Sequence, residues 1–177
     1  MRLQVADMEK RAFSVESKGR TLSGYAAVFD SPTLIGSFSE VVKKGAFTRS
    51  LSSQEAPKIT AIYEHNPEHL LGRLGSNTLR LWEDDKGLRF ELDLPNTTLG
   101  NDVAELVKRG DLAGCSFGFI VRSENWTDTA REILDVDLFE ITITSQPAYD
   151  ATSVDIRAKR KGIKRLVAAQ KYLECFK

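Results

Sequence analysis

The feature that most constrains the fold is a run of alternating residues over Leu112–Val121. Cys115 and Phe117 fall on one parity of this run, while Ser116 and Gly118 fall on the other. A period of two is typical of a half-buried β-strand, so the sulfur and the aromatic ring are predicted to face the core and Ser116 the opposite side. Because Gly118 has no side chain, a peptide could approach closely beside the Ser116 hydroxyl.

Length and composition limit the class of protein. The chain has 177 residues, of which 41% are hydrophobic and 28% charged, and this is enough for one domain with its own core. No apolar run reaches the roughly 18 residues that a membrane span requires, and the N-terminal residues lack the apolar core of a signal peptide. A cytoplasmic protein is therefore expected.

The cysteine and histidine content points away from metal chemistry. The two cysteines, Cys115 and Cys175, do not make a disulfide framework, and no cluster of Cys and His has zinc-site spacing. We expect neither a structural metal nor a cofactor.

The coarse pattern of elements favours an α+β or mainly β fold. Alternating segments predict eight or nine short strands, among them 12–16, 21–29, 37–42, 58–65, 79–83, 88–94 and 132–144. Helices are predicted over 45–51 and 101–110, the second ending at Gly110. The expected architecture is a mostly antiparallel β-barrel or a highly twisted sheet with a few helices on its outside.

Charge divides the chain into a body and a tail. We expect a flexible N-terminus over 1–10, one domain over 11–156 and a basic tail over 157–177, since 157–165 is strongly basic. The helical spacing of apolar residues over 166–173 indicates a basic amphipathic helix, and the alternative is a solvated or disordered extension. Nucleic-acid binding by the tail is not favoured, because no aromatic residues interleave the basic run.

A reactive serine needs a base, and the base needs an orienting group. The two histidines of the chain, His65 and His69, lie close together. His65 is the favoured base because it ends a predicted strand and so has a fixed direction, whereas His69 follows a turn at Asn66–Pro67 and is expected to be a solvated loop residue. The alternative for His65 is a histidine at the rim with an ordinary hydrogen bond.

A candidate orienting group follows from strand pairing. If the strands flanking the segment 124–129 pair in antiparallel fashion, a pairing centred on Asp128 sets Ser116 opposite Glu140. Pairings whose register is shifted by two residues leave the two side chains diagonal to each other on the same face. The alternative for Glu140 is a solvated carboxylate. The opposite parity of the second strand is then predicted to enter the core, at Phe139, Ile141 and Ile143.

Cys115 is the alternative nucleophile, since it adjoins Ser116 and could also use His65. Strand parity places it on the aromatic side, where a buried cysteine is usually inert. The sequence therefore favours the serine.

Several motifs in order resemble one family, the tailed-phage (caudoviral) prohead serine proteases, and through them the herpesvirus assemblins. The resemblance covers most of residues 10–157 and is carried by Leu22–Phe29, Gly45–Phe47, Tyr63–Asn66, Leu71–Arg73, Gly110–Phe119, Leu138–Thr142 and Gln146–Tyr149. Motifs in the right order are far more specific than any one of them.

The resemblance implies Ser116 as nucleophile and His65 as base. The third member in assemblins is a second histidine, whereas the matching region here has Glu140, and a carboxylate that orients an imidazole is chemically ordinary. Arg73, in the family-like Leu-Gly-Arg, is a candidate for ordering the site, with a structural salt bridge as the alternative.

The implied function is a serine endopeptidase of capsid maturation that acts in the host cytoplasm, inside the assembling procapsid. Its expected partners are the major capsid protein and the scaffold segment, with self-association and self-cleavage, and the tail would be a targeting or removable segment. The alternatives are a non-catalytic assembly factor that binds coat or scaffold protein, and a small-molecule hydrolase with the same triad.

Overall fold

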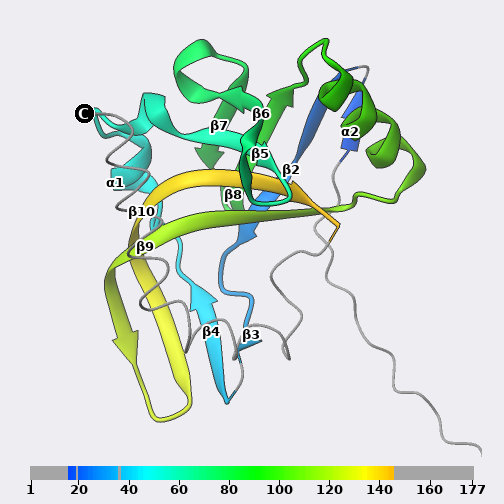
Figure 1. Cartoon of the computed structure of the whole chain (residues 1–177). Helices are drawn as coiled ribbons and strands as arrows, with labels where there is room; N and C mark the ends of the chain where they lie inside the picture. Colours follow the sequence, from blue (N-terminus) through cyan, green and yellow to red (C-terminus); the bar gives the residue numbers. More distant parts are fainter. Residues whose placement is uncertain (1–15, 19, 36, 146–177) are drawn as a thin grey trace, which may run out of the picture.

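The computed structural model describes residues 16–18, 20–35 and 37–145. Within these residues ten strands form two sheets (Figure 1). The first sheet is antiparallel, in the order β1 (Glu16–Lys18), β2 (Thr21–Val28), β8 (Gly87–Asp93), β7 (Leu79–Glu83). The second has the order β3 (Thr33–Ile35), β4 (Phe38–Val42), β10 (Ala130–Thr144), β5 (Thr60–Tyr63), β6 (Asn66–Arg73), with β9 (Gly114–Trp126) also paired to β10.

Short helices connect the strands. The α-helices are α1 (Thr48–Leu51) and α2 (Thr98–Arg109), and the 3-10 helices are η1 (Ala56–Lys58) and η2 (Leu74–Ser76). The side-chain hydroxyl of Thr97 accepts the Gly100 N–H at 3.2 Å, and Gly110 ends α2 with a left-handed φ of 83°. The predicted stop at Gly110 is confirmed, but α2 begins three residues before the predicted start because Thr97 caps it.

Every second residue of β8 faces the core of the first sheet. Leu88, Phe90 and Leu92 on β8 are fully buried, and Leu79 on β7 lies opposite Leu92. This is the hairpin predicted over 79–94. One core cluster contains residues of both sheets, so the sheets pack on each other across a shared apolar layer.

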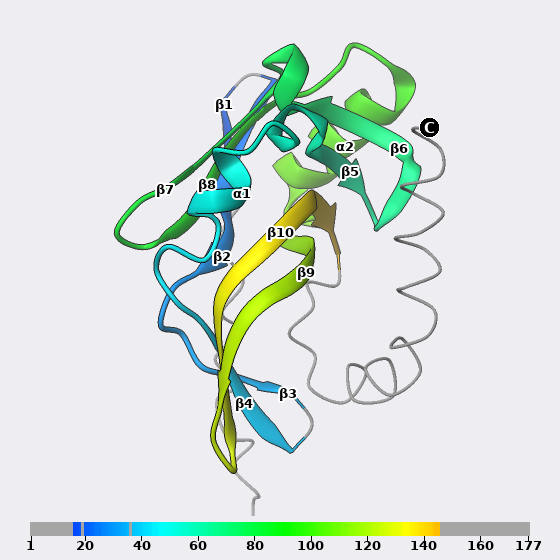
Figure 2. The ribbon, with the colours of Figure 1, turned by 90° about the vertical axis from the view of Figure 1, so that its left-hand side faces the viewer.

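Strands β9 and β10 form a long bent ribbon that crosses the molecule (Figures 1 and 2). Strand β9 occupies one edge of β10 along most of its length, so β4 and β5 share the other edge, at 130–133 and 140–143. Both of these pairings are parallel, while the other six pairings among the described strands are antiparallel, in keeping with the mostly antiparallel sheet expected.

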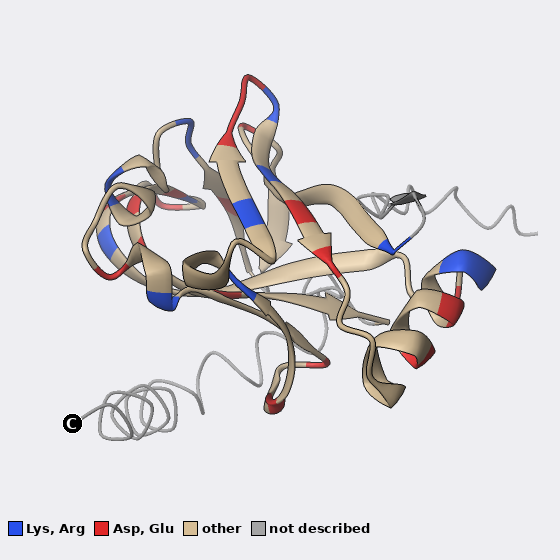
Figure 3. Cartoon of the chain, turned by 90° about the horizontal axis from the view of Figure 1, so that it is seen from above, with Lys and Arg blue, Asp and Glu red and all other residues tan. Residues whose placement is uncertain are grey.

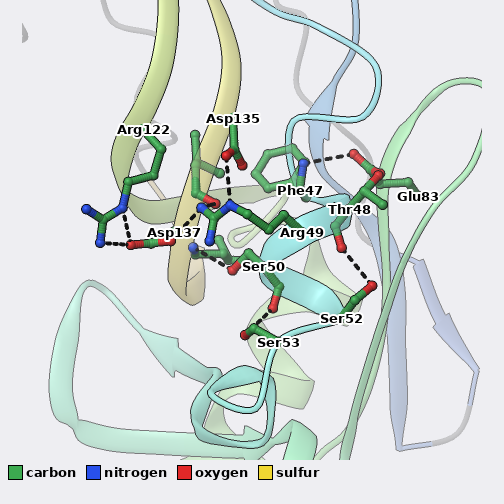
Figure 4. Close-up of polar contacts among 12 residues, drawn as sticks. Phe47, Thr48, Arg49, Ser50, Ser52, Ser53, Glu83, Arg122, Asp135 and Asp137 are labelled. Atoms are coloured by element: carbon green, nitrogen blue, oxygen red, sulfur yellow. Dashed lines mark hydrogen bonds and ion pairs between the residues drawn. The ribbon is translucent and has the colours of Figure 1, made fainter.

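The segment that includes α1 fills the interval between β4 and β5 on that edge (Figure 4). The Val136 N–H donates to the Ala46 carbonyl at 3.0 Å, and the Leu138 N–H donates to the Ser50 hydroxyl at 3.0 Å. Arg49 on α1 also donates to the carboxylates of Asp135 and Asp137, at 2.7 and 2.6 Å. The Val136 and Leu138 N–H groups on this edge of β10 thereby have hydrogen-bond acceptors without another strand.

The predicted mainly β class with few helices is confirmed, but the barrel is not. Within the described part of the chain, neither sheet closes: the larger one ends at the edge strands β3 and β6. Strand β6 carries Pro67, which has no N–H to donate to a further strand and is tolerated at an edge. The N-terminus predicted over 1–10 and the tail predicted over 157–177 lie outside the described residues.

Figure 3 shows Lys and Arg interspersed with Asp and Glu over the sheets and α2. Among the described helices, none has the length and apolar character needed to cross a membrane.

Candidate active site

Ser116 lies near the start of β9, and the alternation predicted around it is confirmed for the core side. Cys115 is fully buried in the core, and Phe117, Phe119 and Val121 pack against that core. Ser116 itself is only 3% exposed, so its face of the strand is not the open patch that the sequence led us to expect.

Glu140 lies opposite Gly118, two residues from Ser116 along β9. The observed register pairs Ser116 with Thr142, and Gly118 with Glu140, so the register centred on Asp128 is wrong and the neighbouring one is found. Paired residues project to the same side of a sheet, so Ser116 and Glu140 share one face as diagonal neighbours.

A bulge at Phe139 explains the shift of parity along β10. The pairing changes between Leu138 and Glu140, which leaves Phe139 as the extra residue. Leu138 is therefore buried while Phe139 is only partly so, which corrects the prediction that Phe139 enters the core. Ile141 and Ile143 are fully buried as predicted.

Gly118 accommodates the Glu140 side chain. A Cβ at position 118 would lie 2.7 Å from Glu140 Cγ, 3.0 Å from Cδ and 3.1 Å from Oε1. Any residue but glycine would push the Glu140 carboxylate away. The absence of a side chain at Gly118 thus makes room for Glu140. The sequence had instead suggested room for a peptide beside Ser116.

His65 occupies the two-residue turn between β5 and β6. Tyr63 pairs with Asn66, and the turn residues Glu64 and His65 have φ of 50° and 54°. Positive φ at both central positions is the mark of a type I′ hairpin turn, which favours Asn and Gly. For other residues the left-handed region costs about 1–2 kcal/mol each. The base candidate is thus in a strained turn and does not end a strand as predicted.

The end of β10 holds this turn through its backbone. The Glu64 N–H donates to the Ile143 carbonyl at 3.0 Å, and the His65 N–H donates to Thr142 Oγ1 at 3.0 Å. Thr142 is fully buried, and its hydroxyl donates in turn to the Ile62 carbonyl at 3.2 Å. Thr142, which pairs with Ser116, is therefore hydrogen-bonded to the backbone N–H of His65.

The Glu64 carboxylate adds a second anchor. It accepts hydrogen bonds from Thr144 Oγ1 at 2.8 Å and from the backbone N–H and hydroxyl of Ser145 at 2.7 and 2.8 Å. Burial by itself raises the pKa of this carboxyl, but the bonds from Ser145 and Thr144, together with the charge of His65, outweigh it and lower the pKa below its ordinary value.

The His65 ring contacts Glu140. His65 Nδ1 lies 3.1 Å from Glu140 Oε1, so an Nδ1–H donor would leave Nε2 free as an acceptor. Within the described residues, the Ser116 hydroxyl makes no hydrogen bond to this ring. The His65–Glu140 pair therefore involves a carboxylate on the same face of the β9–β10 ribbon as Ser116. Catalytic hydrogen bonds are often long before substrate binds, so Ser116 remains a candidate.

The remaining sequence candidates lie elsewhere. His69 is a residue of strand β6 and not of a loop, and its ring stacks on Tyr63 with centroids 6.0 Å apart. Arg73 ends β6, and its Nε donates to the Pro57 carbonyl at 3.2 Å, which is a structural contact. Burial raises the pKa of the Cys115 thiol, so that thiol is a poor nucleophile.

Sequence reasoning missed Thr142 and Glu64. No glycine or asparagine marks the turn at Glu64, so its type could not be read from the sequence. Thr142 has the parity of Glu140, and that shared parity was the only available signal. Among the described residues, no group of three or more His, Cys, Asp or Glu side chains could hold a metal ion.

Comparison with known proteins gives one family. The family model described as caudovirus prohead serine protease matches residues 6–165, which is nearly the whole chain. No curated protein and no solved structure matches the sequence.

Proposed function

Because the chain belongs to the caudovirus prohead serine protease family, and is in that sense a phage capsid-maturation protease, we propose that Ser116, His65 and Glu140 are its catalytic triad. The observation that carries this proposal is the contact between His65 Nδ1 and Glu140 Oε1, at 3.1 Å, on the face of the ribbon that bears Ser116. Acyl transfer needs a serine, an imidazole and an orienting carboxylate in one site, and the shared face of Ser116 and Glu140 supports this assignment.

Each residue has a distinct part in the proposed reaction. His65 Nε2 removes the Ser116 proton as Oγ attacks the peptide carbonyl carbon, and the imidazolium then gives that proton to the departing amine. Water attacks the resulting ester while His65 takes its proton, which releases the new carboxylate and restores Ser116. Glu140 accepts the Nδ1–H throughout, holding the tautomer and stabilising the imidazolium.

The proposed substrates are the major capsid protein and its scaffold segment, cleaved within the procapsid. Self-cleavage between the domain over 11–156 and the basic tail over 157–177 is part of the same proposal.

Co-expression with the major capsid protein tests this function. We expect the wild type to give capsid fragments, and Ser116→Ala to lose at least about 10³-fold in cleavage rate, as removal of a triad nucleophile does. Intact mass of every product locates each cut, including any within the chain itself. The control is Ser123→Ala, an exposed serine of the same strand. Equal processing by Ser116→Ala and wild type would overturn the assignment.

A further inference from the structure

Two residues outside the proposed triad hold its histidine in place. The turn Glu64–His65 has a left-handed backbone at both residues, although neither is a glycine or asparagine. Such a conformation persists only where surrounding contacts impose it, and those contacts are commonly found at functional sites. Among the described residues, the hydrogen bonds to the backbone of this turn and to the Glu64 carboxylate come from residues 142–145, at the C-terminal end of β10 and just beyond it.

The Thr142 hydroxyl bridges the turn and the preceding strand. It accepts the His65 N–H at 3.0 Å and donates to the Ile62 carbonyl at 3.2 Å, so both its donor and an acceptor position are used. Because Thr142 is fully buried and lies opposite Ser116, it links the backbone of the base to the strand pair that carries the nucleophile.

The Glu64 carboxylate fixes the other half of the turn. Its two oxygens accept three hydrogen bonds from Thr144 and Ser145, the residues that follow the Thr142–Ile143 pair on β10. The hydrogen bonds lower the pKa of this carboxyl, in keeping with a carboxylate that stays charged at neutral pH.

We propose that Thr142 and Glu64 are positioning residues that clamp the strained turn, so that the His65 ring meets Glu140 and faces Ser116. This inference rests on the proposed function for its catalytic consequence. The hydrogen bonds of both side chains go to backbone groups or to Thr144 and Ser145, so the proposed clamp acts through the direction of His65. A displacement of about 1 Å in a catalytic group can cost about 10²-fold in rate.

Amide hydrogen exchange tests the clamp without any substrate. In Thr142→Val, which keeps the side-chain shape, the His65 N–H loses its acceptor, and its exchange rate should rise at least about 10-fold. Thr142→Ser keeps the hydroxyl and should keep the protection. The Phe90 N–H in β8 reports global folding and should be unchanged in both variants, and unchanged His65 exchange in Thr142→Val would overturn the clamp.

Steady-state cleavage of the capsid protein tests the positioning role. We expect Thr142→Val to lower kcat by about 10²-fold with KM nearly unchanged, and Thr142→Ser to restore most of it. Thr129→Val, the same change in an exposed turn at the far end of the ribbon, is the matched control and should cleave as the wild type does. Unchanged kcat in a Thr142→Val protein with raised His65 exchange would overturn the positioning role.

Glu64→Asn separates anchoring from backbone strain. Asparagine tolerates left-handed φ better than glutamate does, but its shorter side chain withdraws the acceptors from Thr144 and Ser145. A fall in kcat supports the anchor, and wild-type kcat overturns it. Ser116→Ala, run beside these variants, shows separately whether the proposed function fails, since the exchange result does not depend on catalysis.

Discussion

At the scale of single residues, the proposed site depends on Gly118, which has no side chain. Gly118 leaves room for Glu140, whose Cγ would otherwise lie 2.7 Å from a Cβ. Gly118→Ala should push the carboxylate from His65 and lower kcat/KM at least about 10-fold, within the roughly 10⁴-fold range known for a lost triad carboxylate. Ile120→Ala, an exposed change two residues along the same strand, is the control.

A double mutant shows whether Gly118 acts through Glu140. Glu140→Asp shortens the side chain and so disrupts the same contact with His65. Gly118→Ala with Glu140→Asp should therefore be no worse than the poorer single variant. Losses that simply multiply would show that Gly118 acts on another part of the site.

At the scale of elements, ion pairs between side chains hold α1 to β10. Asp137 accepts from Arg49 at 2.6 Å and also pairs with Arg122 (Figure 4). Burial raises the pKa of Asp137, but these two guanidinium groups outweigh it and lower the pKa below its ordinary value. A carboxyl whose pKa is lower in the folded state stabilises the fold above its unfolded pKa of about 3.9, and that stability is lost as pH falls through the folded value.

Thermal melting across pH tests this pairing. Arg49→Gln should melt below the wild type at pH 7. The difference should shrink as the pH falls below about 3.9, where the unfolded chain takes up the proton, and further as it passes the lower pKa of folded Asp137. The exposed ion pair between Lys58 and Glu55 is the control, and Lys58→Gln should change the melting temperature little. A difference between Arg49→Gln and wild type that persists at low pH would contradict the ionic origin.

The same scale shows what the sequence could predict. Period-two patterns identified the Ser116 strand, its buried Cys115 side and the hairpin over 79–94, because those signals are local. The parallel pairing of β10 with β4 and β5 depends on contacts between distant segments, which periodicity does not contain. The bulge at Phe139 and the turn at Glu64–His65 also escaped, since none of these three residues is a glycine or proline.

At the scale of the whole molecule, the proposed site draws its residues from three segments. The β5–β6 turn brings His65, β9 brings Ser116, and β10 brings Glu140 together with the contacts that hold the turn. Sequence and resemblance supplied the identities of these residues. Their arrangement needed the fold, because a one-residue slip of β9 on β10 would move Ser116 to the opposite face from Glu140.

The most direct test of the triad is covalent labelling of the folded protein by a fluorophosphonate. Ser116 Oγ should displace fluoride from phosphorus as His65 takes its proton, and peptide mapping should place the adduct on Ser116 alone. His65→Ala and protein unfolded in urea should stay unlabelled, because both lack the assembled base. An adduct on another residue, or none in a preparation that cleaves capsid protein, would contradict the proposed triad.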